Sequence, residues 1–599
     1  MTKTTVLRDR TITTTTPILS YCVALPEPQN HLFEVTLKVE NWRSDRLNLQ
    51  MPVWTPGSYL VREYSRHVQD FKATIKSEKE SEEESLHLRK LEKNHWQIDT
   101  EDTTSITVYY RVYANELTVR TNHLDRTHGY FNGASLFFFI PSWENIPYQI
   151  AIALPYPDWH ITTSLPKVKG QENTFIAENF DVLVDSPFEI GKQTIYNFEV
   201  LGKPHQWAIW GEGNLEPDRL IEDTKKIIKT ETKLYGNLPD SLPYDEYIFL
   251  LHLSNDGFGG LEHKNCCSLI YDRLGFRNKE RYNRFLQLVA HEFFHLWNVK
   301  RIRPKALETF DYTRENYTTS LWFCEGATSY YDTIIPLWAK VYDRKTFFET
   351  INKDITRYLQ TPGRNVQSLN ESSFDAWIKL YRRHPNSDNS QISYYLKGEM
   401  VSFLLDLRIR RKYKNTRSLN DVMQIIWEKF GQAEIGYTPQ QLQEVIESVA
   451  EEDLSDFFHK YLQEMVKLPF EEYLLPFGLK IESVFEKNPY PYLGIRTIIE
   501  EQKTKIQFVW DHSPAAKVGI DIDDELLAID GIRVTHDNLN ERLRDYQAGD
   551  AIAVTVFHQE ILQTYQIILD EPEPIRYQII QIKSSTFAEK ELLEGWLNS

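Results

Sequence analysis

The sequence of 599 residues predicts a multidomain α+β protein. Three features of the chain indicate this class. Its first part alternates apolar and polar residues, as half-buried strands do, whereas its middle part changes from strand-like segments to apolar residues at helical spacing. The pattern changes again after Leu479. Because a domain usually holds about 100 to 200 residues, a chain of this length should form about three to five domains.

The first predicted domain, residues 1–183, is an antiparallel β-sandwich-like domain. Residues 31–42 alternate apolar side chains such as Phe33 and Val35 with polar neighbours, and residues 106–113 follow the same pattern. Alternation with a period of two places one side of each strand in a core and the other side in water.

The second predicted domain, residues 184–482, combines a sheet with helices. Its first part is strand-like, at residues 196–210 and 246–254. Its later part is helical and includes residues 401–412, 419–430 and 439–449. A sheet followed by helices is typical of an α+β domain.

A further helix is predicted over residues 281–300, where apolar residues recur at helical spacing without Gly or Pro. It contains His291, Glu292 and His295 in the spacing His-Glu-x-x-His. Residues four apart lie one above the other on a helix, so the two imidazoles can share one tetrahedral metal ion. Glu292 then lies beside the metal and can act as a general base on a metal-bound water. The alternative is a pair of core histidines satisfied by hydrogen bonds.

A third ligand is needed for a catalytic metal site. Residues 318–332 form another apolar helical stretch with an isolated carboxylate, Glu325, which is costly to bury unless a cation pairs with it. Asp332 lies seven residues further on the same face, where it could orient a ligating histidine. The alternative for Glu325 is a glutamate in a first helical turn beside Gly326.

Composition excludes several function classes. The net charge of −18 leaves no basic excess for binding nucleic acid. The four cysteines are too few for a disulfide framework and are expected to be buried thiols in a reducing compartment. The amino terminus lacks the apolar core of a signal peptide, and no stretch approaches the roughly 20 apolar residues of a membrane span. These features predict a cytoplasmic protein without a membrane span.

Several motifs together resemble one enzyme family. HEFFHLWNVKRIRPKAL at residues 291–307, followed by LWFCEGATSYYD at 321–332, is similar to the glycyl aminopeptidases. These are gluzincin zinc metallopeptidases with a thermolysin-like catalytic domain and a C-terminal PDZ domain. Residues 53–67, in which Pro56 and Gly57 break a strand, resemble the N-terminal signature of that family. The resemblance implies one Zn²⁺ per chain, with the ligands and general base named above.

The resemblance also points to a substrate-binding element at Gly259, Gly260 and Glu262. In related aminopeptidases this element is an exposed strand ending in a Gly-rich turn, whose glutamate receives the free α-amine of the substrate. Leu261 and His263 replace the Met and Asn common in the larger relatives, which weakens the case for strict exopeptidase action. The alternative for Glu262 is a surface-loop carboxylate.

ISYYLKGEM at residues 392–400 resembles the segment that supplies a tyrosine hydroxyl to the tetrahedral intermediate. The match at Lys397-Gly398 assigns this role to Tyr395, although its neighbour Tyr394 is one residue away. A phenol stays protonated at neutral pH and can donate to a developing oxyanion. An ordinary pair of core tyrosines is the alternative.

The last part of the chain, residues 483–575, resembles a PDZ domain. Leu493, Gly494 and Ile495 match its carboxylate-binding loop, which accepts an extended C-terminal peptide as an added strand. Asp523 replaces the usual Gly before an aspartate in a later turn. The alternative role is a domain that only covers the catalytic domain. Residues 576–599 are predicted to form a tail with at most a short amphipathic helix.

The sequence thus predicts a zinc aminopeptidase that hydrolyses the N-terminal bond of peptides with a free amine. A preference for small residues such as Gly or Ala is implied by the resemblance alone. One alternative is an endopeptidase or processing protease whose PDZ domain delivers C-terminal tails. Another is a PDZ binding protein with a structural zinc site, against which the intact Glu292 argues.

Overall fold

The computed structural model describes residues 16–76, 83–101, 103–236 and 242–598. The chain divides into two compact units, which are described separately. The first comprises Met1–Pro217, Pro243–Asn278 and Phe310–Glu315, and the second comprises Asp218–Leu242, Lys279–Thr309 and Asn316–Ser599.

The structure can be compared with two predictions made from composition, one on membrane and signal segments and one on the cysteines. Residues 1–15, which carry most of the segment inspected for a signal peptide, lie outside the described residues. No helix in the described part of the chain is long and apolar enough to cross a membrane. The expectation of buried thiols is wrong for Cys22, which is exposed, and holds for the other three cysteines.

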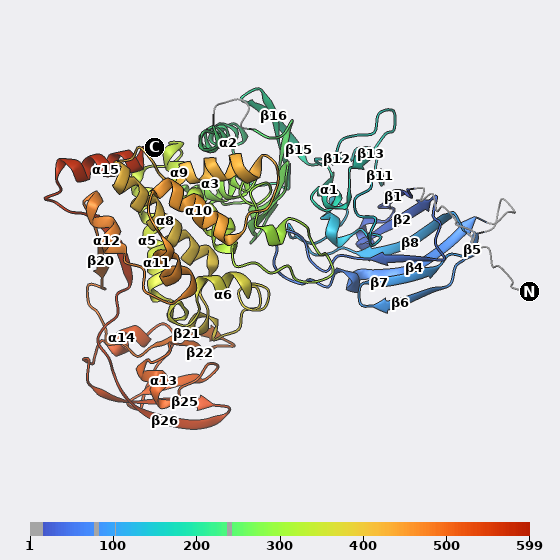
Figure 1. Cartoon of the computed structure of the whole chain (residues 1–599). Helices are drawn as coiled ribbons and strands as arrows, with labels where there is room; N and C mark the ends of the chain where they lie inside the picture. The colour runs from blue at the N-terminus through green and yellow to red at the C-terminus, as the bar shows by residue number, and fades with distance from the viewer. Residues whose placement is uncertain (1–15, 77–82, 102, 237–241, 599) are drawn as a thin grey trace, which may run out of the picture. The chain divides into compact units, whose positions relative to one another are not determined.

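The first unit begins with a seven-stranded sheet (Figure 1). Its strands, in spatial order, are β13 (Thr174–Ala177), β11 (Tyr148–Ala153), β1 (Ile18–Ala24), β2 (Leu32–Glu40), β8 (Ser105–Tyr113), β4 (Val68–Lys76) and β5 (Glu83–Ser85). Phe33 and Val35 of β2 are buried, as the alternation predicts. Most neighbours pair antiparallel, but β1 and β11 run parallel. A three-stranded sheet of β3 (Arg46–Gln50), β7 (His95–Asp99) and β6 (Leu88–Glu92) adds to this β-rich domain.

Two further sheets complete the first unit. One has the order β12 (His160–Thr162), β14 (Phe188–Gly191), β10 (His128–Phe131) and β9 (His123–Leu124). The other has the order β15 (Thr194–Val200), β16 (Lys203–Trp210), β17 (Tyr247–Ser254), β19 (Cys266–Asp272) and β18 (Phe258–Glu262). The strands predicted within 196–210 and at 246–254 are therefore confirmed.

The second unit is mainly helical. The helix predicted over 281–300 is α3 (Lys279–Phe294), which ends six residues earlier than predicted. The later predicted helices correspond to α8 (Tyr394–Tyr413), α9 (Leu419–Ile426), which continues as a π-helix (Trp427–Gly431), and α10 (Pro439–Ala450). Other helices that bear on the site are α2 (Pro217–Thr232), α4 (Thr328–Trp338) and α5 (Arg344–Gln360). The molecule is thus a multidomain α+β protein with a mainly helical second unit.

In the second unit, a six-stranded sheet and two short helices lie where the sequence resembles a PDZ domain; besides β24 (Ile532–Arg533), which pairs off the main path, the sheet has five strands. Its strands are β21 (Ile495–Glu500), β22 (Lys503–Val509), β23 (Glu525–Ile529), β25 (Ala551–His558) and β26 (Ile561–Ile568), and its helices are α13 (Pro514–Val518) and α14 (Leu539–Leu543). After it, β27 (Arg576–Gln581) pairs antiparallel with β20 (Leu479–Val484). The helix expected in the tail is α15 (Phe587–Leu597), and it buries Trp596.

Candidate active site

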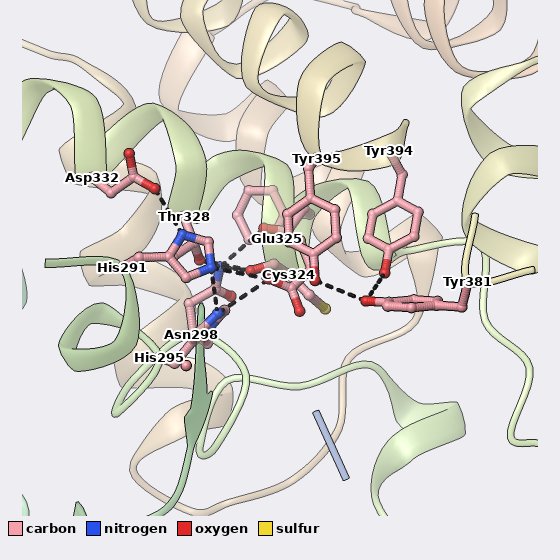
Figure 2. Close-up of polar contacts among 12 residues, drawn as sticks. His291, His295, Asn298, Cys324, Glu325, Thr328, Asp332, Tyr381, Tyr394 and Tyr395 are labelled. Carbon is pink, nitrogen blue, oxygen red and sulfur yellow. Dashed lines mark hydrogen bonds and ion pairs between the residues drawn. The ribbon is translucent and has the colours of Figure 1, made fainter. Parts of the chain in front are cut away.

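Three side chains of the second unit converge at the end of α3 (Figure 2). The Nε2 atoms of His291 and His295 lie 3.1 Å apart. The Oε2 atom of Glu325 lies 3.4 Å from Nε2 of His291 and 3.1 Å from Nε2 of His295. These separations are close to those of ligands around one tetrahedral metal ion, which are about 3.3 Å apart for bonds of about 2.0 Å.

The other ring nitrogen of each histidine, Nδ1, already has a hydrogen-bond partner. Nδ1 of His291 lies 2.7 Å from Oδ2 of Asp332, and Nδ1 of His295 lies 2.5 Å from the backbone oxygen of Asn298. Because both partners accept, each Nδ1 carries the proton and each Nε2 presents a lone pair. Two ring nitrogens and a carboxylate oxygen this close together need a proton or a metal cation between them. The residues therefore fit a bound divalent metal.

Glu325 belongs to a short π-helix, Trp322–Ala327, that precedes α4. A π-helical turn shifts the backbone hydrogen bonds by one residue and leaves carbonyl groups without their usual helical donor. Asn298 compensates, because its Nδ2 donates to the backbone oxygens of Phe323 (2.9 Å) and Cys324 (3.1 Å). The same residue thus holds His295 through its carbonyl group and the Glu325 turn through its side chain.

Two glycines bring the π-helix against α8. A Cβ atom on Gly326 would lie 2.5 Å from the Cα atom of Gly398, and one on Gly398 would lie 2.5 Å from the backbone oxygen of Trp322. Only residues without a side chain permit this approach. The contact explains why Glu325-Gly326 and Lys397-Gly398 occur in the two motifs.

Tyr395 of α8 faces the cluster of His291, His295 and Glu325 (Figure 2). Its ring lies 6.3 Å from the ring of His291, nearly parallel to it. Its hydroxyl is 3.0 Å from that of Tyr381, which is also 3.1 Å from the hydroxyl of Tyr394. Burial and the charge of Glu325 raise the pKa of Tyr395 well above 10, so it keeps its proton. Tyr381, which no motif in the sequence marked, thus contacts both Tyr394 and Tyr395.

Buried carboxyl groups lie behind His291. Burial raises the pKa of Asp332, although its hydrogen bond with His291 opposes this. Burial and the nearby Asp332 raise the pKa of Glu231 in α2. Burial would lower the pKa of His291, but the hydrogen bonds of Asp332 and Glu325 outweigh it and raise that pKa. A metal cation bound by His291 and Glu325 would favour the ionised form of these buried carboxyl groups. Glu292 lies on α3 beside His291 and is buried.

In the first unit, Glu262 ends strand β18 and is 4% exposed, so it is no surface-loop residue. Its Oε1 atom has no hydrogen-bond partner among the described residues. Gly57 lies against it, because a Cβ atom there would be 2.4 Å from that oxygen. Gly57 also has φ of +84°. The strand-breaking motif at residues 53–67 therefore packs on the carboxylate, a contact that the sequence did not reveal.

Gly259 and Gly260 lie on the same edge strand, opposite Ile270 and Leu269 of β19. Gly259 has φ of +141° with open space where a Cβ atom would be. The backbone oxygen of Gly260 accepts a 2.8 Å hydrogen bond from Nη2 of Arg120. Arg120 thus fixes the strand that carries Glu262, and no motif in the sequence marked it.

Leu493, Gly494 and Ile495 line a cavity of about 610 Å³ in the second unit. Leu539 and Leu543 of α14 line it as well, as does Arg364. Gly494 has φ of +83°, and a Cβ atom there would meet Cβ of Ser513. The loop therefore borders a groove between β21 and α14, where a PDZ domain holds an added strand.

Three family models match the chain. A Peptidase M61 N-terminal domain model matches residues 20–192, an M61 glycyl aminopeptidase model matches residues 284–401, and a PDZ domain model matches residues 491–569. The second range contains the His291, His295 and Glu325 cluster. The fold, the donor set and these matches define a metallopeptidase.

A solved structure supports the family over the whole chain. The crystal structure of an aminopeptidase N family protein from Idiomarina loihiensis is 30% identical, with a TM-score of 0.89, and the match covers 97% of this chain and 100% of that one. The chain belongs to the M61 glycyl aminopeptidase family.

Other solved structures are similar to this chain at much lower sequence identity and TM-score. Yeast LTA4 hydrolase in complex with bestatin is 13% identical (TM-score 0.44, 76% of this chain and 68% of that one). A point mutant of an M1 zinc metallopeptidase from Deinococcus radiodurans is 12% identical (TM-score 0.46, 76% and 94%). No curated protein matches the chain at a significant level.

Proposed function

We propose that this protein is a zinc-dependent aminopeptidase that releases the N-terminal residue of peptides, with a preference for small residues such as Gly or Ala. The observation that carries the proposal is the convergence of two Nε2 atoms and one carboxylate oxygen, with both Nδ1 atoms held by acceptors. The preference for small residues rests on membership of the glycyl aminopeptidase family alone.

His291, His295 and Glu325 would hold one zinc ion per chain. When bound, zinc polarises the scissile carbonyl group and lowers the pKa of a water molecule towards neutrality. Glu292 follows His291 directly on α3 and takes the proton of the attacking water. It then delivers this proton to the amine nitrogen that leaves. General acid–base catalysis of this kind contributes about 10²- to 10⁴-fold to a rate.

Tyr395 donates its hydroxyl proton in a hydrogen bond to the oxygen of the scissile carbonyl group as negative charge develops there. Its raised pKa keeps it protonated across the neutral range, so it acts as a donor throughout. Tyr381 holds the hydroxyl from the other side at 3.0 Å and limits its rotation.

Glu262 would pair with the free α-amine of the substrate and so fix cleavage at the first bond. Support comes from its burial and from Oε1, which lacks a hydrogen-bond partner within the described residues. A buried carboxylate without a partner is costly, and an ammonium group offsets this cost. The PDZ groove at Leu493, Gly494 and Ile495 would bind a C-terminal peptide through backbone amides.

A pair of matched substrates tests this proposal. Zinc-loaded protein is offered an Ala-led peptide with a free amine and its N-acetylated twin, beside a Glu292→Gln variant with verified zinc content. We expect cleavage of the free peptide only, and loss of activity in the variant with zinc retained. Equal cleavage of both peptides would assign an endopeptidase instead. An inert, zinc-loaded wild type would leave the PDZ groove as the functional site.

A further inference from the structure

A second cluster of metal-binding side chains lies in the first unit, outside the active site described above. His128 is on β10, Glu189 on β14 and His252 on β17. The first two strands belong to the four-stranded sheet and the third to the five-stranded sheet. One ligand atom from each residue lies within 4.8 Å of the other two. Their exposed fractions are 0%, 1% and 1%, respectively.

The polar atoms of this cluster are poorly satisfied. Nε2 of His252 lies 2.7 Å from Oε2 of Glu189. The remaining atoms Nδ1 of His252, Oε1 of Glu189 and Nε2 of His128 have no hydrogen-bond partner among the residues that the structure describes. Each buried polar atom without a partner costs about 1 to 3 kcal/mol. Three such atoms in one place are more than a stable core normally contains.

The imidazole of His128 is held in the neutral form that binds metals. Burial lowers the pKa of His128 well below its usual value, and the neighbouring His252 lowers it further. A neutral ring keeps one nitrogen lone pair for coordination. Burial raises the pKa of Glu189, while His252 opposes that rise. A cation between the three residues would favour the ionised carboxylate and bind one nitrogen of each ring.

Aromatic rings enclose the cluster. The ring of Trp210 stacks on His128 with centroids 3.8 Å apart, and the ring of Tyr130 meets His252 edge-on at 4.7 Å. The hydroxyl of Tyr130 donates to Oγ of Ser268 at 2.8 Å, which fixes this wall. These contacts hold the imidazoles in place and keep bulk water away from them.

An outer carboxylate completes the arrangement. Oδ1 of Asp125 lies 4.0 Å from Nδ1 of His128, on the side away from the unsatisfied Nε2. Oδ2 of the same residue lies 3.3 Å from Nε2 of His123. A separation of 4.0 Å is too long for a hydrogen bond from the ring. Asp125 instead accepts from the backbone N–H of His128 at 3.2 Å, and Nδ1 of His128 contacts Oγ1 of Thr127 at 3.4 Å.

We propose that His128, Glu189 and His252 bind a second divalent metal ion, which joins the four-stranded sheet to the five-stranded sheet. Two imidazoles and one carboxylate form a donor set that suits zinc. All three ligands are buried and lie on strands, so they are rigidly held, and a water molecule would fill the fourth position of a tetrahedral ion. The proposal is independent of the catalytic centre, whose ligands belong to the second unit.

Metal content tests this inference directly. Each protein is loaded with zinc and freed of loosely bound ions. The number of zinc ions per chain is then measured by elemental mass spectrometry. We expect two zinc ions per chain in the wild type and one in the His291→Ala/His295→Ala variant, which lacks the active-site ligands. A wild type with a single zinc that disappears in this double variant would overturn the proposal.

Variants at the second cluster assign the remaining ion. His128→Asn/His252→Asn, combined with the active-site double variant, should contain no zinc. His205→Gln provides the matched control, because His205 is also buried on the five-stranded sheet, but both its nitrogens have hydrogen-bond partners, the backbone oxygen of Lys203 and the hydroxyl of Tyr244. The control should keep the full zinc content. An equal loss of zinc in the control would contradict the assignment.

A second readout does not require the cluster variants to fold. Cobalt(II) is bound to the His291→Ala/His295→Ala variant, and its visible absorption is recorded. We expect the d–d bands of a four-coordinate site and a fall in the melting temperature when the metal is removed by a chelator. Cobalt without such bands, or an unchanged melting temperature, would overturn the structural role.

Discussion

At the scale of single residues, each imidazole of the proposed catalytic centre is held by a different acceptor. His291 has a carboxylate, Asp332, whereas His295 has the backbone oxygen of Asn298. A carboxylate partner makes the imidazole a stronger ligand and fixes its tautomer. Only the carboxylate can be removed by mutation without a change of the backbone.

Asp332→Ala should therefore weaken zinc binding by about 10- to 100-fold, because His291 loses its orienting acceptor. Competition with a chelator of known affinity measures this change. Asp332→Asn is the matched control, since its amide oxygen can still accept from Nδ1 of His291, and its loss should be smaller. Equal affinity in all three proteins would show that Asp332 has no orienting role.

The two neighbouring tyrosines can be separated in the same manner. Tyr395→Phe should lower kcat by about 10²- to 10³-fold, the usual cost of one oxyanion donor, with little change in KM. Tyr394→Phe removes the 3.1 Å contact with Tyr381 and should keep most of the activity. The reverse result would move the catalytic hydroxyl to Tyr394.

Gly57 offers a test of the role assigned to Glu262. Gly57→Ala places a methyl group where the Glu262 carboxylate lies and also strains a residue with φ of +84°. We expect KM for free-amine peptides to rise about tenfold or more, with a smaller effect on kcat. Gly170→Ala in the same unit controls for the strain, because φ is +80° there and nothing lies within 4 Å. A similar KM in both variants would rule out the contact with Glu262 as the cause.

At the scale of elements, the π-helix and α8 depend on each other through Gly326 and Gly398. Gly398→Ala should push the two helices apart, because an added Cβ atom would meet the backbone oxygen of Trp322 at 2.5 Å. Overpacking of this kind costs about 1 to 3 kcal/mol. We expect a lower melting temperature and weaker zinc binding together. Ser402→Ala, at another buried position of α8, should lower neither.

The sequence predicted the existence of these elements better than their details. Helical spacing predicted α3 and α8, and the alternation of Phe33 and Val35 predicted β2. It could not predict the π-helix, because a hydrogen bond shifted by one residue leaves the apolar pattern almost unchanged. It also could not predict that Asn298 supports this turn, since that contact joins residues far apart in the chain.

At the scale of the whole molecule, burial makes the first unit sensitive to acid. Burial lowers the pKa of His205 to about 4, below its unfolded value near 6.5. Protonation therefore favours the unfolded chain, and the stabilisation present above pH 6.5 is lost as pH falls towards 4. Between pH 7 and pH 5 the loss should reach about 2 kcal/mol, since one unit of pKa corresponds to about 1.4 kcal/mol.

Urea unfolding at these two pH values measures the effect. The His205→Gln variant should show a smaller shift of its midpoint than the wild type, because it has no imidazole to protonate at this position. His459→Gln, at an exposed imidazole, controls for the loss of a histidine as such. If His205→Gln shifts as much as the wild type, acid sensitivity has another source.

The candidate site could be predicted only where neighbours in sequence act together. His291 and Glu292 lie in the last turn of α3 and His295 directly follows it, so their spacing in the sequence carried the information. Gly57 and Glu262 come together only when the strands of the first unit fold, and no local pattern indicates such a contact. The cluster of His128, Glu189 and His252 could not be predicted for the same reason, because its residues lie on three separate strands.

The pairing of β20 with β27 also determines how the PDZ domain is attached. The chain leaves the helical part through β20, forms residues 491–569, and returns through β27 beside its point of departure. The backbone N–H of Ile579 donates to Asn352 of α5 at 2.7 Å, and that of Tyr577 donates to Thr356 of the same helix at 2.8 Å. The PDZ domain is therefore an insertion with two anchored ends. A short linker joining residues 484 and 576 should excise it while leaving α15 and Trp596 in place.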